Sequence, residues 1–90
     1  MSVSVAEQRR EPRHPGRGIV RVRSENPGSR DIRGKLMDVS ANGFRMAHQC
    51  AALTAGQYVE FAHVEAKGRA RVVWTRILAE AVESGFVVAD

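Results

Sequence analysis

A turn is predicted at Asp38-Val39-Ser40-Ala41-Asn42-Gly43, a stretch of short polar residues and glycine between two β-like runs. Residues 32–39 form the first run, and alternation of apolar and basic side chains resumes in Phe44-Arg45-Met46. Asn-Gly between two such runs is a strong signal for a two-residue β-hairpin turn. The middle of the chain is therefore predicted to be antiparallel β-structure.

Similar short runs continue on both sides of this hairpin. Residues 20–23, 58–62 and 69–75 alternate in polarity, and residues 85–88 form a last apolar run. Sequential turns suit an antiparallel barrel, and closure of the sheet removes exposed strand edges. We therefore expect an all-β fold, a small six-stranded antiparallel β-barrel over residues 19–90.

The remaining segments are less regular. Residues 49–55 suit a loop or a single helical turn, and residues 77–83 suit a long hairpin connection. Trp74 falls on the same strand face as Ala70 and Val72, which predicts a place in the core rather than a ligand platform.

The N-terminal segment differs from the rest of the chain. Residues 1–18 contain Arg9, Arg10 and Arg13 among prolines and glycines, with almost no apolar periodicity. Such a segment cannot bury enough apolar surface to offset the entropy of ordering it. We predict a flexible, basic N-terminal arm over residues 1–18, which a polyanionic ligand would order.

Length and composition limit the class of protein. The 90 residues correspond to one domain, and a net charge of +4 favours anionic partners. The single cysteine, Cys50, excludes an internal disulfide. No apolar stretch is long enough for a signal peptide or a membrane span, so we expect a cytoplasmic protein without membrane insertion.

Two motifs, in this order, resemble the pattern of the PilZ domain family, RxxxR followed by (D/N)xSxxG. Arg9 and Arg13 match the first motif, and Asp38, Ser40 and Gly43 match the second. The resemblance covers nearly the whole chain and includes three further matches: LxxGQxVEF at residues 53–61, VVW at residues 72–74 and GF at residues 85–86.

This resemblance implies both a fold and a ligand. PilZ domains are six-stranded β-barrels that bind cyclic dimeric guanosine monophosphate (cyclic di-GMP), a bacterial second messenger. The residues implied to bind it here are Arg9, Arg10, Arg13, Asp38, Ser40 and Gly43. PilZ domains commonly continue into a C-terminal helix. Because this chain ends at Asp90, we expect no such helix, and apolar residues near the barrel mouth would then favour self-association or partner docking.

The chemistry of these residues suits the implied ligand. The planar fork of arginine matches phosphates and the O6/N7 edge of guanine. Asp38 would accept hydrogen bonds from N1 and N2 of guanine, a contact that adenine cannot reproduce. Ser40 would contact the same base or a phosphate, and Gly43 would leave the surface free of a Cβ.

The leading hypothesis is a binding module that senses cyclic di-GMP and signals through an unidentified protein partner in trans. The first alternative is a PilZ-like protein-interaction module without nucleotide binding. The second is a small basic nucleic-acid-binding barrel, which is disfavoured because such proteins display exposed aromatic rings for base stacking.

Catalysis and metal binding find no support in the sequence. No nucleophile with an adjacent base and no pair of carboxylates stands out, so an enzyme is not expected. His14, His48, His63 and Cys50 lack the spacing of metal ligands. We expect no cofactor other than the nucleotide ligand.

Overall fold

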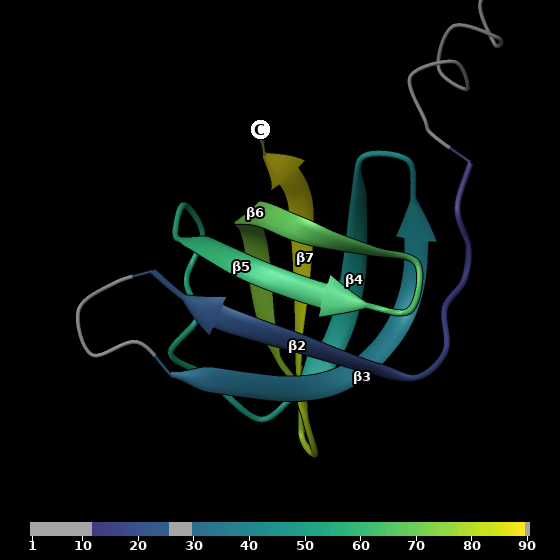
Figure 1. The fold of residues 1–90 in the computed structure, drawn as a ribbon. Helices are drawn as coiled ribbons and strands as arrows, with labels where there is room; N and C mark the ends of the chain where they lie inside the picture. The colour runs from purple at the N-terminus through teal and green to yellow at the C-terminus, as the bar shows by residue number, and fades with distance from the viewer. Residues whose placement is uncertain (1–11, 26–29, 90) are drawn as a thin grey trace, which may run out of the picture.

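The computed structural model describes residues 12–25 and 30–89, which form strands and loops and contain no helix (Figure 1). Arg9 and Arg10 lie outside the described residues. The seven strands are β1 (His14–Pro15), β2 (Ile19–Ser24), β3 (Asp31–Ser40), β4 (Gly43–His48), β5 (Tyr58–His63), β6 (Ala66–Ile77) and β7 (Val82–Ala89).

Strands β2 to β7 close into an antiparallel barrel. Neighbouring strands follow the order β3-β2-β5-β6-β7-β4, and β4 pairs back with β3. Figure 1 shows β2, β3 and β5 across the front of the barrel and β4 and β7 behind them. The short β1 pairs with the end of β3, with His14 opposite Val39 and Pro15 opposite Asp38. The expected six-stranded antiparallel β-barrel is confirmed, with one additional strand.

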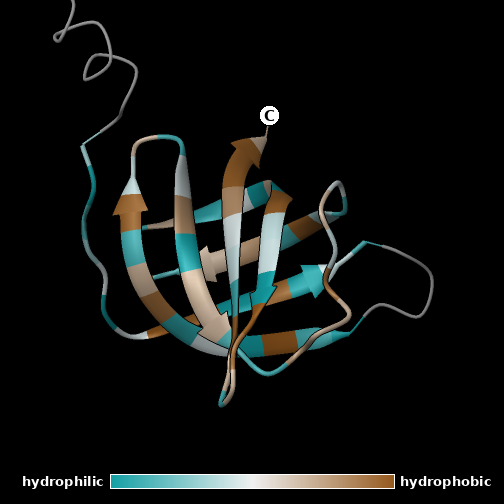
Figure 2. Cartoon of the chain, turned by 180° about the vertical axis from the view of Figure 1, so that it is seen from behind, coloured by the Kyte–Doolittle hydropathy of each residue, from teal (hydrophilic) through white to brown (hydrophobic). Residues whose placement is uncertain are grey.

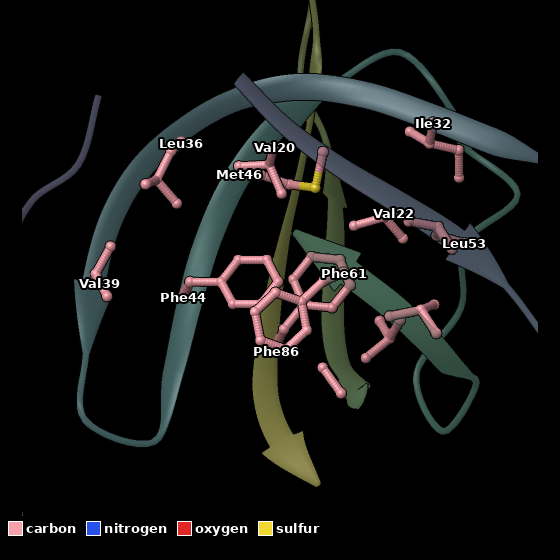
Figure 3. Close-up of a cluster of buried hydrophobic side chains, with 13 residues drawn as sticks. Val20, Val22, Ile32, Leu36, Val39, Phe44, Met46, Leu53, Phe61 and Phe86 are labelled. Carbon is pink, nitrogen blue, oxygen red and sulfur yellow. The ribbon is translucent and has the colours of Figure 1, made fainter. Parts of the chain in front are cut away.

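Alternate side chains of the strands fill the barrel, because successive residues of a strand point to opposite faces. Three phenylalanines lie at the centre of this core (Figure 3). Phe44 stacks on Phe86 with ring centroids 4.6 Å apart, and its centroid lies 4.8 Å from that of Phe61. Around them, fully buried side chains include Val20, Val22, Leu36, Met46, Val59 and Val72. Each large apolar side chain buried in this way stabilises the barrel by about 1.5–3 kcal/mol.

Two β-bulges interrupt the alternation. The register shifts at Met37 in β3 and at Val73 in β6, so each strand carries one extra residue. An extra residue reverses the faces that the following side chains occupy. Asp38 and Trp74 therefore lie at the outer surface, although the residues two positions before them are fully buried. The core position expected for Trp74 is wrong for this reason.

The connections differ in detail from those expected. Residues 49–57 form a loop with turns and no helical turn. The β6–β7 connection spans only residues 78–81, because Ile77 still pairs with Val82. Val82 is buried, whereas Ile77 and Leu78 are 68% and 42% exposed. The prediction that residues 77–83 connect two strands of a hairpin is thus confirmed, but the connection is shorter than predicted.

The β3–β4 hairpin turns one residue earlier than predicted. Ala41 and Asn42 form the turn, and Gly43 already pairs with Ser40 as the first residue of β4. A Cβ on Gly43 would overlap the carbonyl oxygen of Phe86 in β7. Glycine is therefore required here because β4 and β7 approach each other closely.

Residues 12–18, the described part of the expected arm, lie along the barrel. The Gly16 N–H donates to the Met37 carbonyl at 2.9 Å, and a Cβ on Gly16 would overlap the Leu36 side chain. The His14 Nε2 lies 2.9 Å from Glu65 Oε1 in the β5–β6 turn. These contacts hold the segment against β3 and against one end of the barrel. The rest of the expected arm lies outside the described residues.

A buried chain of hydrogen bonds connects β4, β7 and β6. The Cys50 N–H donates to His48 Nδ1 at 3.0 Å, so Nε2 carries the ring proton and donates to Ser84 Oγ at 2.8 Å. The Ser84 hydroxyl also lies 2.8 Å from Thr75 Oγ1. Burial lowers the pKa of His48. His48 donates to Ser84 and is therefore not arranged to take a proton from it.

Acidification is expected to destabilise the fold through His48. An unfolded histidine has a pKa of about 6.5, and burial lowers the pKa of His48 below that value. As the pH falls through about 6.5, the unfolded chain takes up a proton that the folded chain resists, so the free energy of unfolding decreases. His48→Gln should reduce this pH dependence, as measured by urea unfolding between about pH 7.5 and 5.

His63→Gln is the matched control for this prediction. Burial also lowers the pKa of His63, but the Glu65 carboxylate opposes the shift. The pH dependence should therefore change less in His63→Gln than in His48→Gln. Identical unfolding profiles for the wild type and His48→Gln across this pH range would contradict the assignment.

Candidate ligand-binding site

A row of four residues crosses the outer surface of the barrel. Direct register partners run from Asp38 in β3 to Arg45 in β4, Gly85 in β7 and Trp74 in β6. Directly paired residues of neighbouring strands share one face of the sheet. The two β-bulges turn the end members of the row outward. Figure 2 views the molecule from the side of β4, β7 and β6, and shows both polar and apolar segments on these strands.

A hollow of about 610 Å³ lies over this row. Its volume falls within the range of about 300–1,000 Å³ that is usual for small-molecule sites. The lining includes four of the six residues predicted to bind the ligand, together with two that were not predicted: Arg13, Asp38, Ser40, Gly43, Arg45 and Trp74. Arg13 is the arginine of the first motif that lies within the described residues. The fold therefore places it at the same hollow as the turn motif.

The Asp38 carboxylate is held between two guanidinium groups. Arg13 Nη1 donates to Asp38 Oδ1 at 2.6 Å, and Arg45 Nη2 lies 2.7 Å from Oδ2. The Asp38 side chain is only 17% exposed, whereas that of Arg13 is 50% exposed. Arg45 Nε is buried and has no hydrogen-bond partner among the described residues. Two cations on one carboxylate leave a net positive charge and several N–H donors for an anion.

Trp74 supplies an aromatic ring at the other end of the row. A Cβ on Gly85 would overlap the indole, so the ring lies directly over the backbone of β7. The Arg76 guanidinium carbon lies 5.1 Å from the ring centroid, within the range of a cation–π contact. The half-buried indole lines the same hollow as Arg45, and a planar ligand could stack on it by displacing the Arg76 guanidinium.

Ser40 and Gly43 have structural contacts within the hairpin. Ser40 is buried, and its hydroxyl donates to the Gly43 carbonyl at 3.4 Å. Gly43 allows the close approach of β7. Both residues line the hollow, but their clearest effect is to fix the β3–β4 hairpin and thereby the register that pairs Asp38 with Arg45.

Sequence reasoning missed Arg45 and Trp74 as site residues. For Arg45 the expected register pointed elsewhere, because a turn at Asn42-Gly43 would pair Asp38 with Ala47, whereas the observed turn pairs Asp38 with Arg45. For Trp74 the alternation pattern pointed the wrong way, since nothing in the residue types of β6 marks the bulge at Val73.

Comparison with known proteins adds no assignment. A scan against protein-family models gives no match, and a search of curated proteins gives no match either. Within residues 12–25 and 30–89, no group of three or more His, Cys, Asp or Glu side chains could hold a metal ion. In the same residues, no helix is long and apolar enough to cross a membrane.

Gly85→Ala is expected to displace the Trp74 indole, because the added methyl group would overlap the ring. Trp74 is the only tryptophan of the chain, so its fluorescence reports this change directly. The emission maximum should shift to longer wavelength and quenching by acrylamide should increase. An unchanged spectrum and unchanged quenching in a folded Gly85→Ala protein would contradict the placement of the ring.

Proposed function

We propose that the hollow over the Asp38–Trp74 row binds cyclic di-GMP and that the chain is a PilZ-like receptor module. The observation that carries this proposal is the convergence of Arg13, Asp38, Arg45 and Trp74 on one hollow. This set combines fixed cations, a carboxylate and an aromatic ring, which suit the phosphates and purine bases of a cyclic dinucleotide.

The cations account for phosphate binding. Arg13 and Arg45 are already oriented by Asp38, so little side-chain entropy remains to be lost when a phosphate binds. Arg13 is the more exposed of the two and is the better placed to turn toward a ligand. Arg9 and Arg10, which lie outside the described residues, are proposed to complete the phosphate contacts from the arm.

The carboxylate and the indole account for recognition of the base. Asp38 Oδ1 accepts a hydrogen bond from Arg13 and Oδ2 forms an ion pair with Arg45, and each oxygen retains a further lone-pair direction. A guanine edge can present N1–H and N2–H donors to that direction, whereas adenine lacks this pair. Trp74 can stack on a base in the same hollow. Ser40 and Gly43 then contribute chiefly by fixing the hairpin that carries Asp38.

The signal is proposed to pass to a protein partner in trans within the cytoplasm of a bacterium. Ile77 and Leu78 at the β6–β7 connection are exposed apolar side chains, which suit a protein contact or self-association. Ile77 ends β6 and Leu78 follows it, so the candidate contact begins three residues after Trp74 of the hollow.

Arg13→Ala and Arg45→Ala should each weaken cyclic di-GMP binding by about tenfold or more, because each removes a charge-assisted hydrogen bond. Isothermal titration calorimetry measures this directly. Arg17→Ala is the matched control, since Arg17 belongs to the same N-terminal segment, is exposed and does not line the hollow. An Arg13→Ala protein that binds as tightly as Arg17→Ala would refute the site.

Asp38→Asn should reduce the preference for cyclic di-GMP over its adenine analogue. The amide cannot accept two donors of guanine as the carboxylate does. Asp31→Asn is the control, because Asp31 is an exposed acid paired with Arg23 outside the hollow. Binding of either dinucleotide should also quench Trp74 fluorescence by stacking. Equal affinity of the wild type for the two dinucleotides would rule out the role given to Asp38.

A further inference from the structure

Strands β3, β2 and β5 lie side by side in one wall of the barrel (Figure 1). The outer face of this wall carries a second cationic surface. Arg21 lies directly opposite Arg33 on one side and Ala62 on the other, and Ala62 lies opposite Lys67 in β6. These side chains form one row on the outer face. None of these residues lines the hollow over Asp38.

Among the described residues, no carboxylate lies within ion-pair distance of the cations of this row. Arg21, Arg33 and Lys67 form no ion pair with any described residue. The next row is different, because Arg23 is paired with Asp31 at 3.0 Å. Like charges directly opposite each other on a sheet are destabilising. The uncompensated row therefore has a cost to folding that an anionic partner would offset.

Exposed apolar side chains lie at one end of the same wall. Ile19 is 60% exposed and lies opposite Lys35, another cation without an ion-pair partner among the described residues. Val64 is 72% exposed in the β5–β6 turn. Ile19 is the first residue of β2 and Val64 directly follows the last residue of β5, so in this antiparallel pair both lie at the same end of the wall. The end of the wall is thus an apolar pair bordered by cations.

We propose that this end of the barrel binds the surface of an anionic phospholipid bilayer. Ile19 and Val64 would enter the boundary between headgroups and acyl chains, and Arg21, Arg33, Lys35 and Lys67 would contact the lipid phosphates. Peripheral binding of this kind depends on apolar area together with electrostatic attraction to anionic lipids. Glu65, the acid nearest to Val64, is already engaged by His14 at 2.9 Å.

Nucleic acid fits this wall less well. Single-strand binding requires aromatic faces that are free for base stacking. Tyr58 is the aromatic residue on the outer face of β5, and the Arg69 guanidinium covers its ring at 4.1 Å from the centroid. The phosphate backbone of a nucleic acid offers no apolar surface to Ile19 and Val64, whereas a bilayer accommodates both apolar and cationic groups.

Sedimentation with lipid vesicles tests the proposal on the full chain. The protein should partition onto vesicles of phosphatidylcholine with about 30% phosphatidylserine, bind pure phosphatidylcholine much less, and dissociate as salt is raised. The double variant Arg21→Gln/Arg33→Gln should bind the anionic vesicles about tenfold or more weakly. Ile19→Ser/Val64→Ser should also bind them about tenfold less, with net charge unchanged.

The variant Arg30→Gln/Arg71→Gln is the matched control. It loses the same charge from exposed residues at the opposite end of the strands and should bind within about threefold of the wild type, since screening limits long-range effects. Equal losses in both arginine variants would reduce the effect to net charge and overturn the proposal. Absence of binding to anionic vesicles would overturn it as well, and so would binding to a single-stranded oligonucleotide without binding to vesicles.

Discussion

Two extra residues, Met37 in β3 and Val73 in β6, determine which side chains line the candidate site. Without these bulges, the alternation of each strand would direct Asp38 and Trp74 into the barrel. A carboxylate in that phenylalanine-rich core would carry a desolvation penalty of several kcal/mol, and its arginine partners could not follow it. Bulges often stand beside functional sites because they redirect a side chain without changing the fold. The site thus depends on local departures from ideal strand geometry.

Asp38 is the centre of the resulting electrostatic arrangement. Its carboxylate joins Arg13 of the N-terminal segment to Arg45 of the barrel. Arg13, the more exposed of these two arginines, thus contacts the site through the Asp38 carboxylate. Exposed ion pairs contribute little to stability. This carboxylate is mostly buried, however, and holds two guanidinium groups within reach of one hollow. In the proposed receptor, Asp38 would therefore orient donors before a ligand arrives, which lowers the entropic cost of binding.

Sequence patterns were sufficient for the barrel and for part of the site. Period-2 alternation identifies the strands because burial of one face dictates residue type, and the turn motif identifies the hairpin that carries Asp38. Arg45 could not be inferred, because the hairpin turns one residue earlier than the Asn-Gly signal indicates and its register differs accordingly. Trp74 could not be inferred either, because a bulge changes the phase of a strand without a distinctive residue type. The role of Gly85 likewise depends on a contact between strands, since its missing Cβ makes room for an indole eleven positions earlier in the chain.

The two surfaces of the barrel meet at the short β1. Arg13 and His14 are consecutive, yet Arg13 contacts Asp38 in the ligand hollow and His14 contacts Glu65 beside the exposed Val64. A ligand phosphate that binds Arg13 beside Asp38 would act on the same backbone segment that positions His14. The contacts of Arg13 and His14 thus provide a physical connection between the candidate hollow and the cationic end of the barrel. If occupancy of one surface changes the affinity of the other, thermodynamic linkage requires the reverse effect to have the same magnitude.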